Sequence, residues 1–383
     1  MDSNAEQGAR LLFFSGGTAL GAVATALTRF THNAVHVITT FDSGGSSATL
    51  RQAFHMPAVG DVRARIMALA DVTVNGNPEL VALFGHRLPM DTPPSGLRTE
   101  LAALAQGQHR LIRAVPDPLR QIVMAHLKDF QVQMPEDLDL AGASIGNLVL
   151  TAGYLAHAHQ LEPVATIFSK LVQALGVVRP VVNDDAHLCV ELENGERIIG
   201  QHRFTGKTAH RISSPIKNMW LTRSLDDPAP ITLCIRPRLA ELIRQADLIC
   251  YPVGSFYSSV LANLLPQGVS EAIHAAPCPK VFIPNLGTDP ELFGLSVQNQ
   301  VERLLAMSKE VRSAGEGDAH KATHGALDAL LVDSDATRYP GGIPQRWLAA
   351  QGIRVYRLPL VVTPPFLDAE RVCTALLKIA GRK

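Results

Sequence analysis

The sequence has no excess of charge of either sign. Thirty-five lysines and arginines balance thirty-five aspartates and glutamates, so the formal net charge at pH 7 is zero. Proteins that coat nucleic acid or an anionic membrane need a basic surplus, so the balance argues against both partners. No stretch approaches 18 uninterrupted apolar residues, so no membrane span is expected. Neutrality does not exclude one small anion, which backbone N–H groups and helix ends can hold.

Cysteine is scarce and scattered. There is no C-x-x-C pair, and the five cysteines lie far apart, at Cys189, Cys234, Cys250, Cys278 and Cys373. That spacing favours buried, reduced thiols over a disulfide framework or a zinc site. Residues 1–7 are polar and lack the charged start and long apolar run of a signal peptide. A cytoplasmic location is the resulting expectation.

What the sequence does contain is an α/β rhythm. A short apolar run over 11–14 leads into a glycine turn, a helical stretch over 19–31 and a second strand over 35–40. This order predicts two parallel strands joined by a right-handed crossover. Further strands are expected at 247–251, 281–283, 329–332 and 354–358. We therefore expect a Rossmann-like, doubly wound, mainly parallel sheet with helices on both faces.

Two segments interrupt this rhythm. Over 78–135 the strand pattern vanishes and the apolar spacing is helical, which predicts a helical excursion. Residues 177–222 carry short β-prone pieces around Asn194-Gly195, the usual two-residue hairpin turn, and predict a small β-rich insert. We expect both to belong to a single domain over 1–383, because the motifs described next spread along the chain yet converge on one cleft.

Five loops are rich in Gly, Ser, Thr or Asn, at 15–18, 42–47, 144–147, 254–257 and 285–288. Several follow expected strands, and open parallel sheets bind ligands at the carboxyl ends of strands where the strand order reverses. The loops therefore predict one ligand cleft. The ligand-binding residues expected from the first loop and the last two are Gly16, Gly17, Thr18, Gly254, Ser255, Tyr257, Asn285 and Thr288.

The first glycine loop favours a phosphate. Gly16 and Gly17 precede a helix, where free backbone N–H groups and the helix dipole attract anions. Their spacing fits neither G-x-G-x-x-G nor a P-loop, which argues against a NAD-dependent dehydrogenase. The alternative is a tight strand-to-helix turn that binds nothing.

The second loop begins with a carboxylate and continues with small residues and hydroxyls: Asp42, Ser43, Gly44, Gly45, Ser46 and Ser47. Such a loop can cradle a second phosphate, while Asp42 could hold a ribose diol or Mg²⁺. Two adjacent phosphate loops suit a diphosphate. The alternative is that Asp42 only caps the next helix.

Two further motifs add candidate catalytic side chains. In the segment 57–63, Arg63 could form two parallel hydrogen bonds with phosphate oxygens, and Asp61 could orient Arg63 or act as a base. The alternative is a surface ion pair between the two side chains. Asn147 carries both a donor and an acceptor, although helix capping would explain its loop equally well. The candidate residues of the two motifs are Gly60, Asp61, Arg63, Ser144, Gly146 and Asn147.

Other polar pairs carry less weight. His157 and His159 are two residues apart on an expected helix, so they do not share a face and a metal site there is not expected. Asp184 and Asp185 could bind a cation, but a polar turn is the simpler interpretation.

Taken in order, these motifs resemble the family that includes 2-phospho-L-lactate transferase (CofD) and the YvcK-type gluconeogenesis factors, also grouped as UPF0052-like. Residues 15–18 resemble the family's G-G-T-G, with Ala19 in place of its last glycine. The other matching segments are 41–51 (D-D-G-G-S-S-G-R-L-R in the family), 57–63 (P-P-G-D-I-R), 142–148 (G-H-S-L-G-N-L), 253–265 (G-P-G-S-L-Y-T-S-V-L-P-N-L-L) and 284–288 (N-V-M-T).

The resemblance implies a Rossmann-like fold with a site across these loops. CofD transfers a phospholactyl group from a guanosine-diphosphate donor to a deazaflavin precursor with Mg²⁺. The YvcK branch binds UDP-sugars, supports cell shape on gluconeogenic carbon sources and has no settled reaction. This chain is more similar to the YvcK branch. It departs from the family where paired aspartates become Asp42-Ser43, which removes one potential Mg²⁺ ligand.

Two functions follow as expectations. In the first, a UDP-sugar-like or GDP-like ligand lies over the first two loops and a phosphate-linked group passes to a small acceptor. Asp42 would hold Mg²⁺ or polarise the acceptor, Arg63 would neutralise the leaving phosphate, and Asn147 and Ser255 would position the donor. In the second, the same pocket is a non-catalytic nucleotide-sugar sensor that regulates carbon metabolism or the cell envelope through a partner. No covalent or redox cofactor is expected, and a homodimer is left open.

Overall fold

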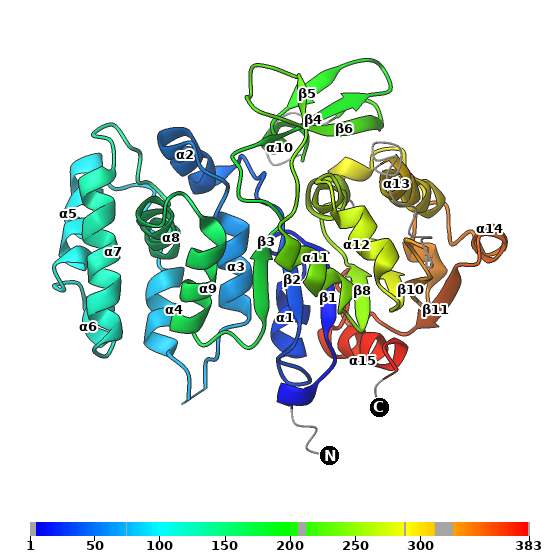
Figure 1. Ribbon diagram of the computed structural model, residues 1–383, viewed down its shortest axis with the longest axis horizontal. Coiled ribbons are helices and arrows are strands. Elements are labelled where there is room, and N and C mark those ends of the chain that lie inside the picture. Colours follow the sequence, from blue (N-terminus) through cyan, green and yellow to red (C-terminus); the bar gives the residue numbers. More distant parts are fainter. Residues whose placement is uncertain (1–4, 74, 206–211, 287–288, 311–324, 382–383) are drawn as a thin grey trace.

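A seven-stranded parallel sheet runs through the centre of the protein, here described from a computed structural model that covers residues 5–73, 75–205, 212–286, 289–310 and 325–381 (Figure 1). Its strands are β1 (Leu11–Ser15), β2 (Val35–Ile38), β3 (Val177–Pro180), β8 (Leu248–Tyr251), β9 (Lys280–Phe282), β10 (Ala329–Asp333) and β11 (Arg354–Leu358). The order is β11-β10-β9-β8-β1-β2-β3. The chain moves outward from β1 to β3 and returns to β8 on the other side of β1. The strand order therefore reverses between β1 and β8.

The sheet is buried on both faces, as the apolar run over 11–14 predicts. Leu11 and Phe13 pack in one core with α1 (Gly21–Leu27) and α15 (Ala369–Ile379). Leu12 and Phe14, which point to the opposite face, pack in a second core. The helices over that face are α11 (Pro237–Arg244), α12 (Val269–Ala275), α13 (Val297–Glu310) and α14 (Gln345–Ala350). The expected doubly wound α/β fold is confirmed.

A helical layer flanks the β3 edge of the sheet and has a core of its own (Figure 1). Residues 78–135, expected to be helical, contain α4 (Pro78–Gly85), α5 (Pro94–Ala105), α6 (Arg110–Ala114) and α7 (Leu119–Gln133). The layer is larger than that segment, because α3 (Gly60–Ala68), α8 (Ile145–Ala156) and α9 (Leu161–Leu171) join the same core. Phe84 and Phe168, for example, stack with ring centroids 4.3 Å apart.

The small β-rich insert lies over the carboxyl end of the main sheet (Figure 1). It is an antiparallel sheet of β4 (His187–Leu192), β5 (Arg197–Ile199), β6 (Ile216–Thr222) and β7 (Pro230–Ile231), with α10 (Gln201–Phe204) beside it. The Asn194-Gly195 turn joins β4 and β5 as expected, and Gly195 has the positive φ that such turns favour.

The expected bounds of the insert, 177–222, are wrong at both ends. Residues 177–180 form β3, which pairs with β2 in the main sheet, and the insert ends with β7 rather than β6. Pro180 is compatible with this place, because proline is rare inside sheets but is tolerated in an edge strand. β3 is the last strand in the order and so occupies an edge.

All five cysteines are free, and four of them are buried. Cys234 is exposed, so the expectation that every thiol is buried is wrong for that one. None of the helices in the described part of the chain combines the length and the hydropathy that a membrane crossing requires. The remaining short elements are η1 (Ala5–Gln7), α2 (Gly45–Phe54), η2 (Phe256–Val260), η3 (Leu261–Leu264), η4 (Pro290–Leu292) and η6 (Ala336–Arg338).

Candidate functional site

The candidate site lies at the carboxyl edge of the sheet, on both sides of the point where the strand order reverses. The first glycine loop follows β1 and the loop of Gly254 follows β8, and these two strands are neighbours. A Cβ added to Gly254 would lie 3.7 Å from the Cβ of Ala19, so the two loops are in contact. This is the place at which open α/β sheets bind ligands.

A buried arginine lies behind the first loop. Arg65 of α3 has no exposed surface, and its Nη2 donates to the carbonyls of Gly16 (3.1 Å) and Gly17 (3.0 Å). In a trans peptide the N–H of the next residue points opposite to the carbonyl. The N–H groups of Gly17 and Thr18 therefore face away from the guanidinium.

Asp61 lies against the same loop and explains its glycines. A Cβ on Gly17 would lie 2.2 Å from Asp61 Oδ1, and one on Gly16 would lie 2.4 Å from Ser259 Oγ. Burial lowers the pKa of Arg65 to about 10, and the negative charge of Asp61 opposes that shift. Arg65 therefore keeps its positive charge at neutral pH.

The second loop presents the start of α2. The helix begins after Gly44 and has no side-chain cap. Asp42 Oδ1 accepts from the Gly44 N–H at 3.1 Å, so this carboxylate closes a turn before the helix instead of capping it. The N–H groups of residues 45–47 find no acceptor among the described residues. Three unpaired N–H groups at the positive end of a ten-residue helix favour an anion.

Ser43 faces the insert. Its hydroxyl lies 2.7 Å from Nδ1 of His202 and accepts from the His202 backbone N–H at 3.2 Å. The side chain is buried. Ser43 therefore joins the second loop to α10 of the insert.

Arg63, Asn147 and Ser46 form a connected group. Arg63 Nε donates to Asn147 Oδ1 at 2.9 Å, and Asn147 Nδ2 donates to Ser46 Oγ at 3.4 Å. Asn147 is almost fully buried, so it positions its two neighbours. Burial is the main cause that lowers the pKa of Arg63 to about 10, with a smaller contribution from Arg87 and an opposing one from Asp61. Arg63 remains a cation at neutral pH.

Small residues allow these helices to approach one another. A Cβ on Gly146 would lie 2.7 Å from Arg63 Cδ, and one on Gly60 would lie 2.4 Å from Ser47 Oγ. Ser144 caps α8 by accepting from the N–H of the third helical residue at 3.2 Å. The loop at 144–147 therefore caps α8 through Ser144, which was the alternative to ligand binding considered for this loop.

The late loop is held by carboxylates that the sequence did not single out. Asp289 accepts from the Phe256 N–H at 2.9 Å, and Glu291 accepts from the N–H groups of Tyr257 and Ser258 at 2.8 Å. These three N–H groups, which could have cradled a phosphate, already have partners. The Tyr257 ring is buried, and its hydroxyl donates to the Ile216 carbonyl at 3.1 Å, so the residue packs in the core.

Asn285 acts as a clamp within the same loop. Its Oδ1 accepts from the Gly254 N–H at 2.9 Å and its Nδ2 donates to the Gly254 carbonyl at 2.6 Å. Ser255 lies next to this clamp and is partly buried. Thr288, the last residue expected in the site, lies outside the described residues.

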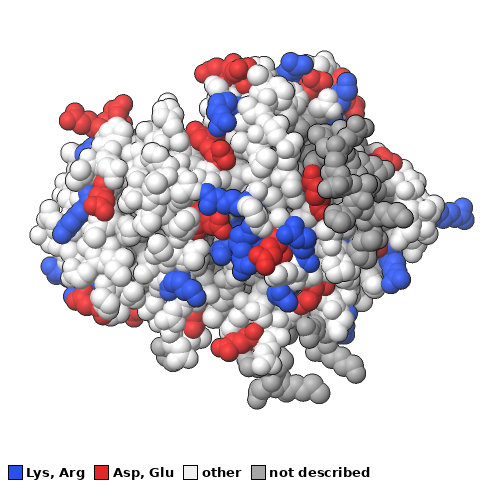
Figure 2. Space-filling view, in the orientation of Figure 1, with Lys and Arg blue, Asp and Glu red and all other residues white. Residues whose placement is uncertain are grey.

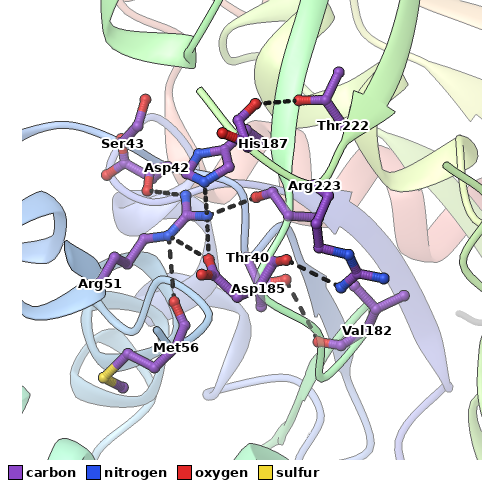
Figure 3. A network of polar contacts seen from close by, with 12 residues as sticks. Thr40, Asp42, Ser43, Arg51, Met56, Val182, Asp185, His187, Thr222 and Arg223 are labelled. Atoms are coloured by element: carbon purple, nitrogen blue, oxygen red, sulfur yellow. Dashed lines mark hydrogen bonds and ion pairs between the residues drawn. The ribbon is translucent and has the colours of Figure 1, made fainter. Parts of the chain in front are cut away.

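A second buried arginine, Arg51 of α2, lies behind the second loop (Figure 3). It donates to the carbonyl of Asp42 (2.9 Å), the carboxylate of Asp185 (2.5 Å) and the carbonyls of Ala186 (2.7 Å) and Met56 (3.3 Å). Asp185 therefore forms a salt bridge and is not part of a cation site of two aspartates. Through Arg51, α2, the second loop and the entry to the insert are fixed together.

A polar cavity lies away from these loops. It has a volume of about 210 Å³ and is lined by β3, the start of α9 and the start of α11. Glu162 bridges two of its arginines, Arg179 at 3.3 Å and Arg236 at 3.5 Å. Figure 2 shows basic side chains gathered over this part of the molecule, among acidic ones. Because its charges are already paired, the cavity is a weaker anion site than the glycine loops.

Several known proteins are similar to this chain. The family model described as 2-phospho-L-lactate transferase CofD matches residues 11–341. The chain belongs to the CofD family. Two similar proteins carry the name gluconeogenesis factor. The one from Bacillus subtilis is 29% identical over 286 residues (73% of this chain, 69% of the relative), and the one from Halalkalibacterium halodurans is 28% identical over 296 residues (77% and 72%).

A crystal structure of a UPF0052 family protein from Bacillus halodurans has the same fold. Its TM-score is 0.70 at 24% identity, and the match covers 97% of this chain and 99% of the other. The resemblance to the CofD and YvcK-type family is confirmed by these findings together.

Replacing Arg51 with alanine should destabilise this CofD-family protein by about 3 kcal/mol. The change removes one partner of a buried ion pair and leaves three backbone carbonyls without their donor. Urea unfolding followed by circular dichroism measures the loss. Arg29→Ala is the matched control, because its ion pair with Glu370 is exposed and should change stability very little. Equal effects of the two changes would contradict the assigned role.

The buried carboxyl group of Glu291 should make the stability of the folded protein depend on pH. Burial, and next the charge of Asp289, raise its pKa from 4.5 to about 8. Between pH 4.5 and about 8, Glu291 keeps its proton in the folded state and releases it in the unfolded state. The free energy of unfolding therefore falls as pH rises, by up to about 1.4 kcal/mol per pH unit.

Glu291→Gln does not titrate at this position. Urea unfolding at pH 5, 6, 7 and 8 should therefore show the stability advantage of the wild type over this variant shrinking as pH rises. Glu370→Gln, at an exposed site, should give a difference that is flat over the same range. An advantage that grows with pH would show that Glu291 is ionised in the folded protein at neutral pH.

Proposed function

We propose that this CofD-family protein binds the diphosphate of a nucleotide or nucleotide sugar across the first two glycine loops. The observation that carries the proposal is the orientation of backbone N–H groups. Gly17 and Thr18 turn theirs away from Arg65, and α2 begins with three N–H groups that have no acceptor among the described residues. Groups of this kind bind phosphate without a basic protein surface.

Arg63 supplies a positive charge in the proposed site. It is joined through Asn147 to Ser46 at the start of α2. A guanidinium fixed in this way can form two parallel hydrogen bonds with phosphate oxygens. Asn147 orients both groups, and Asp61 balances part of the positive charge of Arg63 and Arg65.

Magnesium fits this site only together with the ligand. The described residues contain no group of three His, Cys, Asp or Glu side chains that includes Asp42 and is close enough to hold an ion. Asp42 could offer one carboxylate, and further ligands would come from phosphate oxygens and water, which Mg²⁺ commonly accepts. When bound, the ion would neutralise phosphate charge.

If a transfer reaction takes place, it breaks the bond between a phosphorus atom and its bridging oxygen. The acceptor hydroxyl forms the new bond to phosphorus and loses its proton, and the nucleotide leaves with the bridging oxygen. Asp42 is the carboxylate next to the second loop that could polarise the acceptor, and Arg63 would neutralise the leaving phosphate.

A regulatory role is the second candidate, and the contact between Ser43 and His202 favours it. The residue replaces a carboxylate and joins the phosphate loop directly to the insert. A ligand that orders the second loop would then also bias the position of α10. The similar proteins named gluconeogenesis factor make a role in carbon metabolism the natural context.

Isothermal titration of the full chain with UDP, GDP and UDP-glucose, each with and without Mg²⁺, tests the proposal. We expect at least one diphosphate to bind about tenfold or more tightly than UMP, because UMP lacks the second phosphate. At 100 times its dissociation constant, such a ligand should add about 2.7 kcal/mol of stability. Arg63→Ala should weaken binding by about 10- to 100-fold, which corresponds to 1.4–3 kcal/mol.

Arg29→Ala removes the same charge at a distant exposed site and should leave the affinity unchanged. Absence of binding by every diphosphate would overturn the proposal. If binding occurs, chromatography of the nucleotide after incubation with candidate hydroxyl acceptors separates the two roles. Consumption of the donor supports transfer, and an intact donor supports regulation.

A further inference from the structure

Two histidines and a glutamate converge in the helical layer. His86 follows α4, Glu100 belongs to α5 and His109 precedes α6. Glu100 Oε1 lies 2.7 Å from His86 Nε2 and 3.9 Å from His109 Nε2. One ligand atom from each residue lies within 4.8 Å of the other two. The three side chains are 20–25% exposed, so an ion could reach them from solvent.

We propose that His86, Glu100 and His109 form a binding site for a transition-metal ion, with Zn²⁺ as the best fit. Tetrahedral Zn²⁺ binds nitrogen and oxygen at about 2.0–2.1 Å, which places its ligand atoms about 3.3 Å apart. The two observed distances from Glu100, 2.7 and 3.9 Å, lie on either side of that value. The ligand atoms of His86 and His109 lie within 4.8 Å of each other, so movement of the side chains toward a common centre would complete the geometry. Three protein ligands leave a fourth position for water.

The proton balance is straightforward. Zn²⁺ takes the place of the hydrogen bond between His86 Nε2 and Glu100. A neutral His86 ring binds through Nε2 and keeps its one proton on Nδ1, whereas a protonated ring releases its Nε2 proton to solvent. His109 Nδ1 now accepts from the Leu111 N–H at 3.3 Å, so in the neutral ring Nε2 carries the proton. Binding through Nε2 moves the ring proton to Nδ1 and releases this weak cap of α6.

The site is coupled to the candidate ligand site through the backbone. The His86 carbonyl accepts from the Ile145 N–H at 2.9 Å, and the Leu88 N–H donates to the Ala143 carbonyl at 2.9 Å. These bonds hold the segment that carries Ser144 and α8. A metal at His86 would therefore stiffen the backbone beside that loop, whether or not a nucleotide binds there.

The other histidine pair does not share this geometry. His157 Nδ1 bonds to the Gly153 carbonyl of its own helix at 2.8 Å, and the His159 ring stacks on Tyr154 with centroids 5.1 Å apart. Neither belongs to a metal-ligand group among the described residues. His157 is therefore a suitable control position in the same helical layer.

The test uses the untagged full chain after treatment with a chelator. Titration with ZnCl₂ alone should show one ion per chain and a rise in the melting temperature. Titration with CoCl₂ should give the visible absorption of tetrahedral Co²⁺, a signature that a mere ion pair does not produce. Glu100→Gln and His109→Ala should each weaken Zn²⁺ binding by tenfold or more, whereas His157→Ala and Cys234→Ser should leave it unchanged.

The wild-type titration keeps the proposal testable even if a variant fails to fold. No stoichiometric Zn²⁺ binding by the wild type would overturn it. So would binding that survives the combined change His86→Ala and His109→Ala, or that depends on Cys234. Unchanged far-ultraviolet circular dichroism of the variants ensures that a loss of binding reports the ligands and not unfolding.

Discussion

Two buried guanidiniums hold the loops on which the candidate site depends. Arg65 binds the carbonyls of Gly16 and Gly17, and Arg51 binds the carbonyl of Asp42. Loops at the end of a buried sheet must satisfy their backbone carbonyls, because an unpaired buried polar group is costly. Both arginines do this from the protein interior. The N–H groups on the other side of these peptides are thereby turned away from the guanidiniums, which is the orientation that the proposed diphosphate site requires.

The same arrangement joins the three parts of the molecule. Arg51 ties α2 to the entry of the insert through Asp185, and Ser43 contacts α10 of the insert. Asn147 ties α8 of the helical layer to α2. The sheet, the helical layer and the insert therefore meet around the second glycine loop. An anion bound there would contact loops whose positions all three parts determine.

Much of the fold could be predicted from the sequence. The apolar strands and glycine turns follow from short-range patterns, and the reversal of strand order makes the first and late loops neighbours. The insert boundary was misplaced, because nothing local distinguishes an edge strand such as β3 from a strand of a separate sheet. The loop of Gly254 lies beside the first glycine loop, but Tyr257, which was expected to bind a ligand, packs in the core.

The residues that escaped prediction act on the backbone from a distance. Glu291 binds N–H groups more than thirty residues earlier in the chain, and Arg65 binds carbonyls almost fifty residues earlier. A carboxylate or guanidinium used in this way leaves no periodic pattern. The only sign of this role in the sequence is a second arginine, Arg65, two residues after Arg63. Arg63 has the features of a phosphate ligand, whereas the fully buried Arg65 holds the first glycine loop.

The claim that the glycine loops present their N–H groups to a diphosphate can be tested by NMR. In protein labelled with ¹⁵N-glycine, titration with UDP or GDP should shift the amide signals of Gly17 and Gly45 in a saturable way. The signals of Gly85 and Gly352, far along the chain in other elements, should stay in place. Saturable shifts confined to glycines outside the two loops, or no shift with either nucleotide, would contradict the account.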